Sequence, residues 1–200
     1  IRSLQSIGYS IKYQLLNAAD YRIPQDRFRV FFVGIRNDLQ NTFTFPTAVT
    51  DKKITLKEAI GDIIESPRFF NEETITEEHP TRKNHDVYTG SYDAKYMARN
   101  RVRSWNEQSF TIQAQARNEP QHPQAPKMTY ISSDKRIFAK GYELLYRRLS
   151  VRECARIQTF PDSFVFIYTD IKNGYKMVGN AVPPRLAYAI AIQIRNALPQ

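Results

Sequence analysis

Two helices with recognisable starts, both within the C-terminal quarter of the chain, constrain its fold most. The first opens at Ser150, which forms with Glu153 the Ser-x-x-Glu pattern of a reciprocal capping box. Phe160-Pro161 is predicted to end this helix, because the residue before a proline is pushed out of the helical region. A helix that is specified this locally needs a partner surface, so the chain must supply a core for it.

The second helix is predicted to begin at Pro183-Pro184, where a missing backbone N–H costs little. We expect the preceding glycines, Gly174 and Gly179, to form a turn that leads into it. Apolar residues then recur at helical spacing, at Leu186, Ile190, Ile194 and Ala197. One face of this helix should therefore pack on a larger body.

Two strands are predicted near the N-terminus. Residues 7–16 are rich in strand-forming residues and alternate in polarity, and residues 29–35 form a nearly unbroken apolar run. Such a run is typical of a strand that is covered on both faces. Because two strands alone do not make a stable domain, we interpret them as the edge of a larger α/β sheet whose other strands lie outside this sequence.

Arg27 and Arg29 stand two residues apart at the entrance to the second strand, so their side chains should project to the same side. One interpretation is a functional pair of guanidinium groups. The alternative is a structural pair that flanks a buried strand and is neutralised by carboxylates at its mouth.

The middle of the chain is rich in cations. Arg99, Arg101 and Arg103 alternate with other residues, so in an extended segment they would form one row that suits guanine edges and phosphates. The alternative is a solvated basic edge strand. We predict a further strand over residues 110–117, which carries Gln113 and Arg117.

Three other features bear on organisation. Thr55 and Glu58 form a second capping box, which predicts a short helix. The acidic run at Glu72, Glu73, Glu77 and Glu78 is interpreted as a solvated face that points away from any DNA. Arg148, Arg152 and Arg156 are four apart, and we favour a role in tying the recognition region to the first helix over a role in phosphate contact.

The overall charge and the cysteine content limit the function classes. A net charge of +9 and a pI of about 9.7 favour a polyanionic partner, although a merely basic soluble protein is the simpler alternative. With one cysteine, Cys154, and three histidines, there is no intrachain disulfide and little basis for a metal site. No apolar run is long enough for a membrane helix.

Three blocks of the chain resemble the last three sequence blocks of the DNA cytosine-5 methyltransferases: residues 24–29, 148–162 and 174–184. The resemblance implies a Rossmann-like α/β methyltransferase domain, S-adenosyl-L-methionine as the cofactor and double-stranded DNA as the partner. It implies that Arg29 contacts O2 of the target cytosine and that Arg27 holds neighbouring groups. It also implies that Asn180, Ala181 and Val182 bind the cofactor, whereas a simple helix-starting turn is the alternative for Asn180.

The middle of the chain has a narrower resemblance, to the target-recognition region of HaeIII-type methylases, which modify the inner cytosine of GGCC. Residues 99–107, 110–114 and 122–126 carry it. It implies DNA contacts by Lys95, Arg99, Arg101, Arg103, Gln113 and Arg117. One departure is that Ala114-Gln115-Ala116-Arg117 replaces the expected Ala-Ser-Gly-Arg.

The family's Pro-Cys nucleophile, Glu-Asn pair and cofactor-binding Gly-rich loop do not occur in this sequence. We expect them in a preceding part of a longer enzyme, and Cys154 to be structural and not catalytic. The expected domains are 1–38 as the last strands of the catalytic domain, 39–147 as a mixed target-recognition domain and 148–200 as the returning helices. A bacterial cytoplasmic, nucleoid-associated restriction–modification enzyme is expected; a non-catalytic recognition subunit or an inactive remnant is the alternative.

Overall fold

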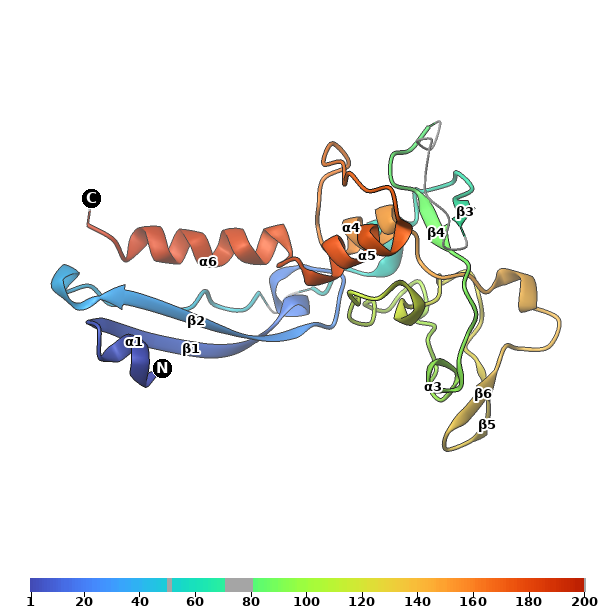
Figure 1. Cartoon of the computed structure of the whole chain (residues 1–200), viewed down its shortest axis with the longest axis horizontal. Coiled ribbons are helices and arrows are strands. Elements are labelled where there is room, and N and C mark those ends of the chain that lie inside the picture. The colour runs from blue at the N-terminus through green and yellow to red at the C-terminus, as the bar shows by residue number, and fades with distance from the viewer. Residues whose placement is uncertain (50–51, 71–80, 200) are drawn as a thin grey trace.

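The computed structural model describes residues 1–49, 52–70 and 81–199. The predicted acidic face at residues 72–78 lies outside them. The molecule is elongated (Figure 1). One end is built from the strands β1 (Tyr9–Asn17) and β2 (Phe28–Arg36) with the helix α6 (Pro184–Asn196) and the short helix α1 (Arg2–Gln5), and the other end holds the remaining α-helices and short strands.

The β1–β2 ribbon forms the first core together with α6. The strands are antiparallel, with Leu16 opposite Arg29. Leu186 and Ile190 of α6 are buried in one cluster with Leu16, Val33 and other residues of the ribbon. The predicted apolar face of the last helix therefore packs as expected, and the predicted Pro-rich start is confirmed.

The other face of the ribbon is open to solvent. Its large apolar side chains are half exposed or more: Tyr13 62%, Leu15 59%, Phe28 57%, Val30 50% and Phe32 58%. Among the described residues one helix covers the ribbon and no second layer does, so the expectation that the second strand is covered on both faces stays a prediction. Burial alternates along β2 in this part of the chain.

The second core surrounds α4 (Val151–Ile157) and α5 (Ile171–Asn180). Helix α2 (Leu56–Ile60) and the parallel pair β3 (Arg68–Phe70) and β4 (Asp86–Tyr88) pack beside them. Both predicted capping boxes are present, at Thr55 for α2 and at Ser150 for α4. Helix α4 ends at Ile157, three residues before the predicted Phe160-Pro161 stop.

A third, smaller core lies at the far end (Figure 1). It joins the segment around α3 (Ala94–Met97) to the hairpin β5 (Thr129–Ser132) and β6 (Lys135–Ile137) through Val102, Met128 and Tyr146. The one remaining α-helix of the described residues is the short α1 (Arg2–Gln5) at the N-terminus. Single 3-10 turns at Ala18–Tyr21, Asn37–Leu39, Ala116–Asn118 and Glu143–Leu145 are the other short helical segments of the described residues.

The predicted glycine turn at residues 174–179 is wrong, because these residues form most of α5. Both glycines serve close packing there. A Cβ on Gly179 would lie 1.9 Å from the carbonyl oxygen of Gln113, and one on Gly174 would lie 2.7 Å from the Tyr168 ring. The sequence therefore needs glycine for what lies beside the helix, not for a turn.

The strand predicted over residues 110–117 is also wrong. This segment runs without a ladder and ends in the 3-10 turn Ala116–Asn118. Its backbone groups are bound by side chains from far along the chain: the Ile112 N–H donates to Gln25 Oε1, and the Ile112 carbonyl accepts from Arg27. Side chains of Gln25 and Arg27 therefore form the hydrogen bonds that a neighbouring strand would otherwise form with this backbone.

None of the helices among the described residues is long and apolar enough to cross a membrane.

Candidate functional site

A cavity of about 180 Å³ lies where the start of β2 meets the junction of α5 and α6. Arg27 and Arg29 line one side, and Asn180, Ala181 and Val182 line the other. The five residues that the resemblance singled out for catalysis and cofactor binding are thus brought together from opposite ends of the chain. Val30, Phe31, Pro183 and Leu186 add apolar walls.

Arg27 is buried at 4% exposure and fixes the geometry of this cavity. Its guanidinium donates to the carbonyls of Ile112 (3.0 Å), Gly179 (2.8 Å) and Ala181 (3.3 Å). Burial, with the charge of Arg29 as a second cause, lowers the pKa of Arg27 to about 10, so the group is still charged at neutral pH. All three of these hydrogen bonds are to carbonyls, so the simple alternative of a carboxylate-neutralised pair is wrong for Arg27.

Arg29 differs from Arg27 in being exposed. Its Nη1 donates to the carbonyl of Phe28 at 2.7 Å, and its side chain lines the same cavity as Arg27. A buried arginine holds the backbone, and an accessible one presents its charge to the cavity. The prediction that the two project to one side is confirmed.

The expected row of three arginines in the middle segment is not present as one row. Only residues around the buried Val102 are extended. Arg101 folds back onto α3, where its Nε donates to the Tyr96 carbonyl at 3.1 Å and its guanidinium lies 4.6 Å from the centre of the Tyr96 ring. Arg99 precedes this extended stretch and is exposed.

Arg103 takes a different direction from Arg101. It pairs with Asp26 at 3.4 Å and Glu107 at 3.3 Å, and lies 4.3 Å from the centre of the Phe110 ring. Asp26 directly precedes Arg27, so Arg103 connects the middle segment to the rim of the first cavity. Local partners of Arg101 and Arg103, together with the distant Asp26, have therefore drawn these two guanidinium groups apart.

A second, larger cavity of about 380 Å³ lies between residues 114–117 and α5. Arg117 lines it, opposite Lys172, Asn173 and Lys176. Of the other predicted DNA contacts, Lys95 and Gln113 are exposed, and the Gln113 carbonyl lies against Gly179. Lys172 and Lys176 were missed in the sequence, although their four-residue spacing could have indicated a common face.

Arg148 and Arg152 are two of the most deeply buried large side chains, each at 1% exposure. Arg148 donates to the carbonyls of Tyr88, Gly90, Ser91 and Arg117. It precedes α4, so the predicted stripe on one helix is wrong for this residue. These bonds confirm that Arg148 ties the middle of the chain to the helical core.

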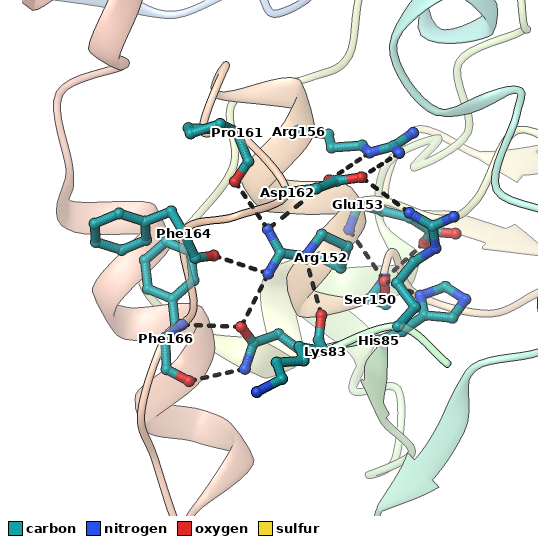
Figure 2. A network of polar contacts seen from close by, with 12 residues as sticks. Lys83, His85, Ser150, Arg152, Glu153, Arg156, Pro161, Asp162, Phe164 and Phe166 are labelled. Carbon is teal, nitrogen blue, oxygen red and sulfur yellow. Dashed lines mark hydrogen bonds and ion pairs between the residues drawn. The ribbon is translucent and has the colours of Figure 1, made fainter. Parts of the chain in front are cut away.

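Arg152, in α4, performs a similar task (Figure 2). It donates to the carbonyls of Lys83 (3.0 Å) and Phe164 (2.8 Å) and to the side chain of Asn84 (3.2 Å). Arg156 pairs with Asp62 and Asp162 nearer the surface. The favoured interpretation of the arginines as ties therefore holds for all three.

Cys154 is fully buried in α4 and its thiol lies 3.8 Å from a carboxylate oxygen of Glu119. Burial raises the pKa of this thiol well above its usual value, and the nearby carboxyl groups of Glu119 and Glu153 raise it further. A thiol that is neutral and inaccessible is not a nucleophile. Cys154 has a structural position.

Two buried groups make the stability depend on pH in one direction. Burial lowers the pKa of His122 to about 4; for Glu153 burial opposes ionisation, but Arg147 at 2.7 Å outweighs it and lowers the pKa to about 2. On acidification the unfolded chain takes up protons first, at His122 from about pH 6.5 and at Glu153 from about pH 4.5. These two groups therefore remove stability between pH 6.5 and about 2, whereas Glu119, whose pKa burial raises well above its usual value, acts in the opposite direction.

We expect the thermal unfolding midpoint to fall steadily as the pH is lowered from 7 to 3. His122→Asn should flatten the upper part of this fall, between pH 6.5 and 4, and leave the lower part. A His122→Asn variant whose midpoint falls as steeply between pH 6.5 and 4 as that of the unchanged chain would contradict the assignment of His122.

The model of the C-5 cytosine-specific DNA methylases matches residues 1–196 of this chain. Among curated proteins, the type II methyltransferase M.MthTI of Methanothermobacter thermautotrophicus is 50% identical over 198 residues, which is 99% of this chain and 60% of that protein. M.FnuDI of Fusobacterium nucleatum is 47% identical over 99% of this chain and 58% of that protein. The chain thus spans about three fifths of the length of these relatives.

The solved structures show the same fold at lower identity. An E. coli protein described as a prophage-encoded DNA modification methyltransferase aligns with a TM-score of 0.65 at 18% identity, over 96% of this chain and 62% of that one. The S. pombe Dnmt2 methyltransferase aligns with a TM-score of 0.52 at 13% identity, over 96% and 59%.

Proposed function

The chain belongs to the C-5 cytosine-specific DNA methylase family, and we propose that it forms the C-terminal portion of an S-adenosyl-L-methionine-dependent enzyme that methylates cytosine in double-stranded DNA. The observation that carries this proposal is the convergence of Arg27 and Arg29 with Asn180, Ala181 and Val182 on one cavity. A bacterial restriction–modification system in the cytoplasm, acting at the nucleoid, is the proposed setting.

The proposed organisation keeps three parts. Residues 1–38 and α6 belong to the catalytic domain, residues 39–147 form the target-recognition domain, and residues from 148 onward return to the catalytic side. The separate core of the ribbon and α6 supports the first part of this division, whereas α4 and α5 share their core with residues of the proposed recognition domain and would support that domain from the side. The exposed apolar face of the ribbon would be covered by the remaining strands and helices of the methyltransferase domain, which would also supply the nucleophilic cysteine.

The chemistry assigned to this chain is charge stabilisation and positioning. The target cytosine, flipped out of the duplex, would enter the cavity so that the exposed guanidinium of Arg29 contacts its O2 oxygen. Negative charge develops on the ring when it is attacked at carbon 6, and a preorganised cation lowers the energy of that state. Arg27, held by three carbonyls, keeps the strand start and the α5–α6 junction in register.

The cofactor supplies the methyl group when it is bound. The fit is favourable at one end, since Asn180 is exposed and lines the cavity with an amide that would donate to the cofactor's carboxylate, in the positive field of the two arginines. The cavity of about 180 Å³ is smaller than the roughly 300 Å³ at which complete small-molecule sites begin, so it would hold only part of the ligand.

The proposed recognition site is GGCC, or a similarly G/C-rich sequence. The resemblance of residues 99–126 to HaeIII-type methylases supports it, as does the preference of arginine for guanine edges. Arg99, Lys95, Gln113 and Arg117 are accessible as they stand. Arg101 and Arg103 would have to exchange their present partners for DNA, which would couple their readout to a local rearrangement.

A non-catalytic recognition subunit is the second candidate, and the burial of the single cysteine favours it for the isolated chain. One experiment tests DNA recognition and methyl transfer by this chain separately. The 200-residue chain should bind a GGCC duplex more tightly than a scrambled one, with affinity that falls steeply with salt. It should transfer no methyl group from labelled S-adenosyl-L-methionine, and measurable transfer would contradict the placement of the nucleophile elsewhere.

Arg29→Ala should lower kcat for cytosine methylation by about 100- to 1000-fold in a protein that contains both this chain and the proposed nucleophile. Because Arg29 is exposed, the unfolding midpoint should stay unchanged. Arg36→Ala, a second exposed arginine on β2 that does not line the cavity, is the matched control. Equal rates for the two variants would remove Arg29 from the catalytic machinery.

A further inference from the structure

The cavity between residues 114–117 and α5 has a lining that suits an extended polyanion. Arg117, Lys172 and Lys176 supply positive charge, and Gln115 and Asn173 supply amides. None of the described residues that line it carries a carboxylate. We propose that this cavity binds the phosphate backbone of the duplex next to the flipped cytosine; the inference rests on the proposed function and assigns Lys172 and Lys176 to it as positioning residues.

The spacing along α5 connects this cavity to the first one. Lys172, Lys176 and Asn180 are four residues apart, so they lie on one face of the helix. Asn180 lines the first cavity and the two lysines line the second. The eight-residue step from Lys172 to Asn180 spans about 12 Å of helix, which corresponds to about three to four nucleotide steps along one strand.

The opposite face of α5 packs in the second core and so fixes the positions of Lys172, Lys176 and Asn180. Ile171, Tyr175 and Val178 are each at 0% exposure in the second core. The end of the helix does not itself offer an anion site, because Asp170 caps it and accepts from the Lys172 N–H at 2.8 Å. Recognition is therefore assigned to side chains, which act as point charges on phosphate and carry no sequence information.

The other wall of the cavity is fixed at both ends. The Gln113 carbonyl lies directly against Gly179, and the Arg117 carbonyl accepts from Nε of the buried Arg148 at 3.3 Å. The exposed side chain of Arg117 is thereby held opposite the lysines. One rigid basic wall of this cavity is thus on α5 and the other is on residues 114–117. Together they would hold the phosphates of one DNA strand while the flipped cytosine of that strand occupies the first cavity.

The test measures binding of the 200-residue chain to a fluorescent duplex with one GGCC site and to its scrambled counterpart. Lys172→Gln/Lys176→Gln removes two proposed phosphate contacts, so the salt slope should fall by about 2 and the affinity by about 10- to 30-fold near physiological salt. Both duplexes should be affected equally, since phosphates are the same in each. Lys12→Gln/Lys57→Gln, which changes the charge equally at exposed sites outside the cavity, is the control.

The outcomes separate this inference from the proposed function. If the unchanged chain prefers GGCC but the double variant binds like the control, the proposed phosphate contacts of Lys172 and Lys176 are wrong and the proposed function stands. If the unchanged chain shows no preference but the double variant alone loses affinity, the proposed phosphate contacts stand and the GGCC proposal fails. Absence of any duplex binding by the unchanged chain overturns both. Unfolding midpoints equal to that of the unchanged chain show that the variants are folded.

Discussion

Arg152→Ala is expected to lower the free energy of unfolding by about 3–5 kcal/mol, the range found when one partner of a buried charged network is removed. The side chain is 1% exposed and satisfies the carbonyls of Lys83 and Phe164 together with the Asn84 side chain (Figure 2). Alanine would leave these part-buried acceptors without the arginine donor, at a cost of up to about 1–3 kcal/mol each. A cavity the size of most of an arginine side chain would add to the loss.

Urea denaturation followed by circular dichroism would measure this loss. Arg195→Ala, at an exposed position near the end of α6, is the control and should change stability by less than about 0.5 kcal/mol. DNA binding by the Arg152 variant should fall only in proportion to its unfolded fraction. A variant with unchanged stability but weaker binding would return Arg152 to the alternative role of phosphate contact.

The features that the sequence predicted correctly are those with local causes. The capping boxes at Thr55 and Ser150 each depend on a side chain and an amide three residues away, so a short pattern suffices. The apolar face of α6 follows from spacing alone. The convergence of residues 27–29 with 180–182 could be expected only through the resemblance, because no local pattern relates segments at opposite ends of a chain.

Most of the predictions that failed did so because of contacts with distant parts of the sequence, although Tyr96 is a local partner of Arg101. Residues 110–117 look like a strand, but Gln25 and Arg27 bind the backbone at Ile112 and no strand lies beside it. Arg101 and Arg103 alternate as a row would, but Tyr96 and Asp26 draw them apart. The second cavity was missed for the same reason, since its two walls come from separate parts of the sequence.

Gly179→Ala is expected to be the second large effect, and it tests how the two cavities are joined. A Cβ at this position would lie 1.9 Å from the Gln113 carbonyl oxygen and 2.5 Å from the Ala114 nitrogen. Both are backbone atoms, so no side-chain rotation can relieve the contact. Alanine within a helix gains about 1 kcal/mol over glycine, whereas overpacking of this kind costs about 3 kcal/mol or more. The packing cost should win, and the variant should be destabilised by at least about 2 kcal/mol.

The displacement should also reach both cavities, because the Gly179 carbonyl accepts from Arg27 and residues 114–117 form a wall of the phosphate cavity. Gly174→Ala is the matched control in the same helix, where the nearest atoms belong to the Tyr168 ring and not to the backbone. A ring can tilt, so this variant should be destabilised less and should keep its affinity for DNA. If Gly179→Ala proved as stable as the unchanged chain, the close contact between α5 and residues 113–114 would be wrong, and with it the physical link between the first and the second cavity.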